Sequence, residues 1–217
     1  MCRDCGCSSQ PEDHSDVLLA RNDHQAQHNR HHFDHSHTLC INLMGAPGCG
    51  KTRMLERMAP ELEGLLVVEG DLSGELDAQR MRRVGIPAIQ IQTGQACHLD
   101  AHMVHEALHQ LDDTPRLLIV ENVGNLACPA DFDLGEHLRV VAVSVTEGDT
   151  KPEKYPAIFA GADAVVLTKL DLLPNVRFSV ESFWHRVKAL NPSAHTFEIG
   201  ADQDIAPLAT WIKNNIT

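Results

Sequence analysis

The chain has 217 residues, 43% of them hydrophobic and only 4% aromatic, which is enough for one medium-sized domain with an aliphatic core. Its formal net charge of -12 argues against nucleic acid or an anionic membrane surface as the main partner, since both require basic patches. No apolar run is long enough to span a bilayer and no signal-peptide stretch opens the chain, so we expect a cytoplasmic protein whose seven cysteines are free or metal-bound.

Residues 1–38 differ in composition from the rest of the chain. Apolar side chains are sparse there, so the segment buries too little surface to offset the entropy lost on ordering. We therefore predict a flexible, metal-binding tail over residues 1–38 and one folded domain over residues 39–217. Because the expected compartment is reducing, we interpret Cys2, Cys5 and Cys7 as ligands that converge on one metal ion, not as a disulfide. The tail also holds His14, His24, His28, His31, His32, His35 and His37.

From Leu39 onward, short apolar runs alternate with longer amphipathic segments. The predicted strands cover residues 39–44, 65–69, 88–92, 117–121, 140–145, 164–168 and 195–199. The predicted helices cover about 51–59, 75–84, 98–111, 154–160, 179–190 and 204–215. This alternation predicts an α/β domain with a mostly parallel sheet covered by helices on both faces, in which ligands bind at the carboxyl ends of the strands.

The first predicted strand runs into GAPGCGKT, residues 45–52, which matches the phosphate-binding pattern G-x-x-x-x-G-K-[ST]. Glycines let the backbone N–H groups of such a loop wrap around a phosphate, and the following helix directs its positive end at the anion. We expect Lys51 to reach the β- and γ-phosphates and Thr52 to ligate Mg²⁺. Cys49 is either a redox- or metal-sensitive switch on nucleotide binding or simply a small residue in a tolerant position. The predicted nucleotide contacts here are Gly45, Pro47, Gly48, Cys49, Gly50, Lys51, Thr52 and Arg53.

Two further strands are followed by carboxylates that could complete a magnesium site with Thr52. Asp71, with Glu69 close by, follows one strand, and Glu121 ends another. Residues 121–124 occupy the place of the D-x-x-G turn of GTPases, so the Gly124 N–H could sense a γ-phosphate. We assign Lys51, Thr52, Asp71 and Glu121 to catalysis, and of these Thr52, Asp71 and Glu121 to Mg²⁺ binding. Two carboxylates at exposed strand ends, with no role in metal binding, are the alternative.

Cysteine and histidine also follow the ends of predicted strands. Cys97 and His98 follow the strand at 88–92, and Cys128 follows the strand at 117–121, so the three side chains can meet on the nucleotide side. Two thiolates and an imidazole suit Zn²⁺ or Ni²⁺, with a fourth ligand from water or a second subunit. His102, His105 and His109 continue from His98 at helical spacing, either as a metal ladder or as solvated surface.

The late strand at 164–168 runs into Thr168-Lys169-Leu170-Asp171, which is typical of the guanine-reading element of GTPases. The Asp171 carboxylate can accept from guanine N1–H and the exocyclic amine, a donor pair that adenine lacks, and the apolar stem of Lys169 can lie on the base. Lys151, in the loop GDTKPEKYP, either approaches the base or a partner subunit or is solvated. No residue stands out as an arginine finger or a water-positioning Gln, so we expect slow intrinsic hydrolysis.

Taken together, the motifs CxxCGC, GxPGxGKT, EGD, TGxxCHLDA, ENVGNLxCP, EGDxKPxKYP and KxDL resemble the HypB family of hydrogenase nickel-incorporation GTPases, of the SIMIBI class of P-loop proteins. The resemblance covers nearly the whole chain, and CHLDA and ENVGNLxCP are its most discriminating parts. Cys49 and Thr168 depart from the residues usual in the family, Ser and Asn.

The resemblance implies a Mg²⁺-dependent GTPase that inserts nickel into [NiFe]-hydrogenase precursors, with GTP/GDP as nucleotide and Ni²⁺ as cargo. It also implies a GTP-dependent homodimer that works with the nickel-binding accessory protein HypA and the hydrogenase large-subunit precursor. Two alternatives stay open: a nickel storage protein, using the tail histidines, whose GTPase is secondary, and a related GTPase that matures another nickel enzyme such as urease.

Overall fold

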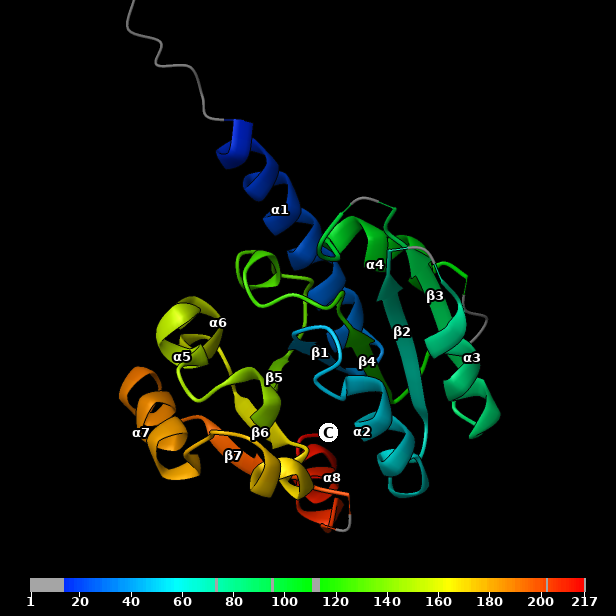
Figure 1. Ribbon diagram of the computed structural model, residues 1–217. Coiled ribbons are helices and arrows are strands. Elements are labelled where there is room, and N and C mark those ends of the chain that lie inside the picture. The colour runs from blue at the N-terminus through cyan, green and yellow to red at the C-terminus, as the bar shows by residue number, and fades with distance from the viewer. Residues whose placement is uncertain (1–13, 73, 95, 111–113, 202, 217) are drawn as a thin grey trace, which may run out of the picture.

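The computed structural model describes residues 14–72, 74–94, 96–110, 114–201 and 203–216 (Figure 1). Cys2, Cys5 and Cys7 lie outside the described residues. Within the described part of the chain, no helix is both long enough and apolar enough to cross a membrane.

Seven parallel strands form one sheet in the order β3-β2-β4-β1-β5-β6-β7. The strands are β1 (Leu39–Gly45), β2 (Leu65–Asp71), β3 (Ala88–Gln92), β4 (Leu117–Glu121), β5 (Leu138–Ser144), β6 (Ala164–Thr168) and β7 (His195–Glu198). Each coincides with a predicted strand, because the five central strands are nearly continuous apolar runs buried on both faces. The predicted fold class is confirmed.

Helices cover both faces of this sheet (Figure 1). They are α1 (His14–His35), α2 (Lys51–Met58), α3 (Leu76–Arg83), α4 (Ala101–Leu108), α5 (Lys151–Lys154), α6 (Pro156–Ala160), α7 (Val180–Leu190) and α8 (Ala206–Lys213), with short 3-10 turns at Ala59–Glu61, Cys128–Ala130, Val145–Glu147 and Leu170–Asn175. Apolar side chains of α2, α3 and α8 share one core cluster with the sheet. Those of α1 and α4, and of α6 and α7, form two clusters on the opposite face.

Helix α1 corrects the expectation of a flexible segment for residues 14–35. Its inward side chains recur at helical spacing: Asn22, Ala26, Asn29 and Phe33 are all buried. The Asn29 amide donates to the carbonyls of Ala101 and Leu134, at 2.8 and 3.0 Å. Composition misled because two of these four buried residues are asparagines, whose side-chain amides are hydrogen-bonded and can therefore be buried.

A loop precedes α4, whose start was expected at residue 98. The helix begins at Ala101 because the Asp100 carboxylate accepts from the Met103 N–H at 2.8 Å and caps it. Cys97 and His98 therefore lie in the loop and not on the helix. This places both side chains at the end of the sheet where β1 and β4 also end.

Candidate nucleotide and metal sites

The phosphate-binding loop joins β1 to α2 at the carboxyl edge of the sheet. Gly50 forms the N-cap of α2 with φ of 103°, a left-handed conformation that favours glycine. The ammonium group of Lys51 is buried and donates to the Gly45 carbonyl at 3.3 Å, bridging the loop. Pro47, Gly48, Gly50 and residues 51–53 line a cavity of about 420 Å³, which we call the phosphate cavity.

Three carboxylates face the phosphate cavity from two neighbouring strands. Glu69 and Asp71 come from β2, and Glu121, from β4, is the register partner of Glu69. The Thr52 hydroxyl donates to Glu121 Oε1 at 2.8 Å. Among the described residues, the second oxygens of Glu69 and Glu121 are buried without a hydrogen-bond partner. Buried carboxylate oxygens of this kind are oxygen ligands suited to a hard cation, so the residues present fit Mg²⁺.

Burial and mutual repulsion shift the acidities of these carboxyls. Desolvation, reinforced by the charge of Glu121, raises the pKa of Glu69 to about 8. Desolvation raises the pKa of Glu121 to about 7, although Lys51 and the Thr52 hydrogen bond pull it down. The two carboxyls therefore disfavour carrying negative charge side by side, and a bound cation would offset both the burial and the repulsion.

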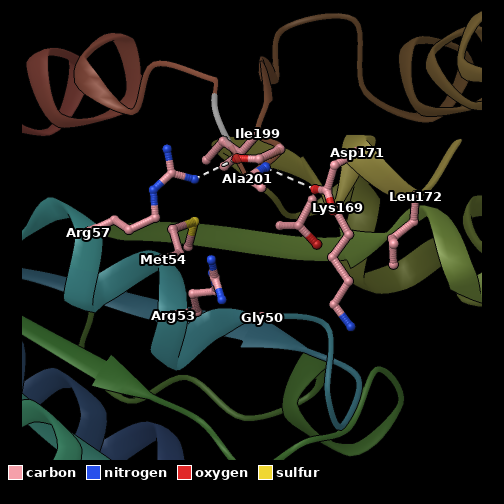
Figure 2. Close-up of a pocket in the computed structure, with 11 residues that line it drawn as sticks. Gly50, Arg53, Met54, Arg57, Lys169, Asp171, Leu172, Ile199 and Ala201 are labelled. Atoms are coloured by element: carbon pink, nitrogen blue, oxygen red, sulfur yellow. Dashed lines mark hydrogen bonds between the residues drawn. The ribbon is translucent and has the colours of Figure 1, made fainter.

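A second cavity of about 210 Å³ lies beside the first, and we call it the base cavity (Figure 2). Asp171 lines it, and its Oδ1 accepts from the Ala201 N–H at 2.9 Å, which fixes the carboxylate (Figure 2). Arg57 closes the far side by donating to the Gly200 carbonyl at 2.6 Å. Lys169 has φ of 59°, and its ammonium group donates to the Gly48 carbonyl at 2.6 Å, so its stem runs from the base cavity to the phosphate loop.

Thr168 and Cys49 meet behind the phosphate loop. The Thr168 hydroxyl donates to the Cys49 and Val143 carbonyls and so ties the loop to β5 and β6. The Cys49 side chain is buried in the core, and desolvation raises the pKa of its thiol to about 11. A thiol that is buried and protonated is a poor switch, so the geometry favours the interpretation of Cys49 as a small packing residue.

Lys151 does not line either cavity. Its ammonium group lies 3.4 Å from Glu147 and 5.3 Å from the centre of the Tyr155 ring. The structure therefore places it in a local ion pair and not among the residues that line the base cavity.

The structure brings Cys97, His98 and Cys128 together, as expected from their positions after the carboxyl ends of two strands. Their ligand atoms all lie within 4.8 Å of one another, the two sulfurs 2.7 Å apart and Cys97 Sγ 3.8 Å from His98 Nδ1. The His98 ring stacks on Phe132 with ring centres 3.9 Å apart, and burial lowers the pKa of His98, which keeps the imidazole neutral and able to bind a metal. We call these three residues the thiol cluster.

Two asparagines that sequence reasoning missed connect the thiol cluster to the nucleotide site. Asn122 follows Glu121, is fully buried, and accepts from the Leu99 and Val123 N–H groups, both at 3.0 Å. Asn125 donates from its backbone to the Gly45 carbonyl at 3.0 Å, and its side chain donates to the Cys97 carbonyl at 3.3 Å. The segment 121–128 therefore touches the phosphate loop at one end and the metal ligands at the other.

Gly124 lies within this segment against the phosphate loop. A Cβ built on it would fall 2.8 Å from Pro47 Cα, a separation that real Cβ atoms do not show. Glycine is needed here for close approach, and Gly124 lines the phosphate cavity. In the sequence, only the position of Gly124 after the strand at 117–121 indicated that it lies beside the phosphate loop.

A parallel sheet, a glycine-rich strand-to-helix loop and paired carboxylates at the strand ends define a P-loop nucleotide-binding protein. The family model for the CobW/HypB/UreG nucleotide-binding domain matches residues 39–198. The chain belongs to this family and, within it, to the HypB hydrogenase maturation factors.

Individual relatives agree with this assignment. The chain is 48% identical to the hydrogenase maturation factor HypB of Azotobacter vinelandii, over 90% of this chain and 67% of the relative. It is 41% identical to the hydrogenase/urease maturation factor HypB of Helicobacter pylori, over 83% and 77%. The crystal structure of HypB from Helicobacter pylori in complex with nickel superposes with a TM-score of 0.86 at 36% identity, covering 89% of this chain and 94% of that one. Matches to other curated HypB proteins span 63% to 66% of their length.

Proposed function

We propose that this protein is a GTP-hydrolysing nickel metallochaperone that delivers nickel during [NiFe]-hydrogenase maturation. The observation that carries the proposal is the segment 121–128, which begins with a carboxylate of the phosphate cavity and ends with a ligand of the thiol cluster. A nucleotide that changes the position of this segment changes the spacing of the metal ligands. We propose that metal binding and nucleotide state are coupled in this way.

We propose guanine as the base. The Asp171 carboxylate, held by the Ala201 N–H, is an acceptor at the wall of the base cavity and suits the N1–H and amino donors of guanine. Adenine offers no such donor pair, so it would leave the carboxylate unpaired. The stem of Lys169 provides an apolar surface for the face of the base.

Thr52, Asp71 and Glu121 are the residues that would hold Mg²⁺, with Glu69 beside them. The ion would supply positive charge to the phosphates during hydrolysis. Lys51 would leave the Gly45 carbonyl to bind the phosphates, and the Gly124 N–H would donate to the terminal phosphate. When this phosphate leaves, Gly124 loses its acceptor and the 121–128 segment is released.

Within the described residues the thiol cluster supplies three protein ligands, and we propose that a water molecule or a second subunit completes the shell of its metal. We propose a GTP-dependent homodimer in the cytoplasm, with Ni²⁺ as cargo and Zn²⁺ as a competitor at this cluster. A nickel-binding accessory protein (HypA) and the hydrogenase large-subunit precursor are the proposed partners, and Cys2, Cys5 and Cys7 the proposed loading ligands.

The test measures Ni²⁺ affinity of the thiol cluster with GDP and with a non-hydrolysable GTP analogue, in full-length protein with Cys2, Cys5 and Cys7 changed to Ala. We expect affinities that differ by about fivefold or more between the nucleotides. Equal affinities would refute the coupling. The Cys128→Ala variant serves as the control that removes the cluster itself.

A second experiment separates delivery from storage. Under nickel limitation, the Lys51→Ala variant is expected to abolish hydrogenase maturation. A variant in which the tail histidines are substituted, with the buried face of α1 unchanged, is expected to keep most of it. The reverse result would favour nickel storage. Because the Helicobacter pylori relative carries urease in its name, urease activity is measured in the same strains, and loss of urease alone would favour that alternative.

A further inference from the structure

Two chain segments carry the ligands of the thiol cluster, and each of them also contacts α1. The first segment holds Cys97 and His98 and runs into α4 at Ala101. The second holds Cys128 and runs through a 3-10 turn into the loop 131–136. Helix α1 lies beside α4 (Figure 1), and its buried side chains reach both segments.

Asn22 of α1 bridges the two segments with one side chain. Its Oδ1 accepts from the Ala101 N–H at 2.9 Å, and its Nδ2 donates to the Asp133 carbonyl at 2.8 Å. The Ala101 N–H lies at the start of α4, where backbone donors have no partner inside the helix, so Asn22 supplies a bond that the helix itself cannot make. Because Asn22 is buried, little water is available to replace either bond.

Asn29, further along α1, makes a second bridge between the same segments. It donates to the Ala101 carbonyl at 2.8 Å and to the Leu134 carbonyl at 3.0 Å. The approach of the second segment is close, because a Cβ built on Gly135 would lie 2.5 Å from the Ala26 carbonyl oxygen of α1. Helix α1 therefore holds Ala101 through both of its backbone groups and packs directly against the second segment.

We propose that α1 is a positioning element of the thiol cluster: through Asn22 and Asn29 it fixes the separation of the two segments that carry the metal ligands. The inference rests on the proposed function in one respect only, that the thiol cluster binds a metal, and it requires no nucleotide. It adds a means of regulation, because any change that separates α1 from the domain breaks both bridges and weakens the metal site.

The separation of the segments matters because the ligands come from both of them. The Cys97 and Cys128 sulfurs lie 2.7 Å apart, and the His98 ring stacks on Phe132 of the second segment. A metal bound by all three ligands requires one spacing, since metal–ligand distances vary by only about 0.2 Å. If the bridges break, the segments can move apart, and the ion then loses at least one ligand.

This coupling must work in both directions. If docking of α1 strengthens metal binding, then metal binding strengthens the docking of α1 by the same factor. Backbone amides of a docked helix exchange with solvent when the helix opens locally, so hydrogen exchange of α1 measures its docking.

The experiment uses the full-length chain with Cys2, Cys5 and Cys7 changed to Ala, without nucleotide. Ni²⁺ is titrated against a competing chelator, and in a parallel titration the Co²⁺–thiolate charge-transfer absorption reports how many thiolates remain bound. We expect Asn22→Ala and Asn29→Ala each to weaken Ni²⁺ binding by about fivefold or more and to reduce the Co²⁺–thiolate absorption.

Three control variants are made in the same background. Cys128→Ala removes the cluster, and only the binding that it removes is attributed to the cluster. Asn191→Ala deletes a buried amide that donates to three carbonyls near α6 and α7, and it is expected to change Ni²⁺ affinity by less than about twofold. Asn22→Asp keeps the acceptor for the Ala101 N–H but loses the donor to Asp133, so it is expected to weaken binding as Asn22→Ala does.

Hydrogen exchange supplies a second readout. Ni²⁺ is expected to slow the exchange of α1 amides by about fivefold and that of α7 amides by less than about twofold, and Cys128→Ala is expected to remove the difference. If Asn22→Ala and Asn29→Ala bind Ni²⁺ as Asn191→Ala does, even with freely exchanging α1 amides, α1 does not position the ligands and only this proposal fails. Unchanged binding by Asn22→Asp would likewise overturn the bridge. If Cys128→Ala removes no binding, the thiol cluster holds no metal, and the proposed function fails with the inference.

Discussion

The Asn122→Ala substitution tests whether the buried asparagine after β4 positions the metal ligands. It removes the acceptor of the Leu99 and Val123 N–H groups and the donor to Asn42 Oδ1, at 3.0, 3.0 and 3.2 Å. Because the site is 1% exposed, no bulk water replaces these bonds. Two orphaned donors at about 1–3 kcal/mol each predict a loss of roughly 2–6 kcal/mol in the free energy of unfolding.

The substitution is also expected to weaken metal binding, separately from its cost in stability. Leu99 follows His98 directly, so releasing its N–H frees the loop that carries two of the three thiol-cluster ligands. Ni²⁺ affinity at this cluster is expected to fall by about tenfold, as for other residues that orient metal ligands. The difference in affinity between GDP and the GTP analogue is expected to shrink to about twofold or less.

Asn191→Ala provides a matched control. Asn191 is also buried and donates to the Phe159, Ala160 and Ala162 carbonyls, on the side of the sheet near α6 and α7. Urea denaturation is expected to show a similar loss of stability for both variants, whereas only Asn122→Ala changes nickel binding. If both variants bind nickel as the wild type does under both nucleotides, Asn122 is only structural and the reasoning is wrong.

Three further predictions concern single side chains. Burial raises the pKa of Glu69 to about 8, so between about pH 4.5 and 8 the folded protein binds more protons than the unfolded chain, and stability falls as the pH rises through that window. Glu69→Gln is therefore expected to stabilise the Mg²⁺-free protein by about 1 kcal/mol or more at pH 8 and hardly at pH 4.5. An equal effect at both pH values would contradict the raised pKa. Asp171→Asn replaces a carboxylate acceptor with an amide that can donate, so affinity for GTP is expected to fall by about 100-fold. Affinity for xanthosine triphosphate, which has a carbonyl in place of the guanine amine, is expected to rise. Unchanged GTP affinity in a titration would count against the base cavity as the guanine site. Cys49→Ser is expected to keep nucleotide affinity within about threefold and the native Cys49 thiol to resist alkylation, because it is buried; rapid modification that blocks GTP would restore the switch hypothesis.

The sheet was predictable because each of its strands is marked by a short stretch of neighbouring residues in the sequence. Each central strand is a short apolar run, and such runs between amphipathic segments leave little choice but a parallel sheet covered on both faces. The phosphate loop and the carboxylates were predictable for a related reason. Their residue types are rare in combination, and the carboxyl ends of parallel strands must share one edge.

Helix α1 was not predictable from composition. Its exposed face is rich in histidine and its buried face holds Asn22 and Asn29, so no apolar stripe marks it. A signal existed, since Asn22, Ala26, Asn29 and Phe33 recur at intervals of three and four residues. Reading it requires the knowledge that Ala101 and Leu134 present backbone groups for those amides, and these residues lie 72 to 105 positions further along the chain than Asn29.

The contacts that join the two sites could not be predicted from the sequence, for the same reason. Cysteine, histidine and carboxylate side chains can be recognised as metal ligands from their residue type. The residues that join them here are asparagines, whose role depends on which backbone groups they hydrogen-bond. Asn125 links the Gly45 and Cys97 carbonyls, two groups 52 residues apart in sequence and therefore invisible to any local pattern. An amide can hold both a donor and an acceptor at fixed separation in a buried site, which a hydroxyl or a carboxylate cannot do with the same geometry. The ligands determine which metal can bind, and under the proposed function these two asparagines would transmit the nucleotide state to the ligands.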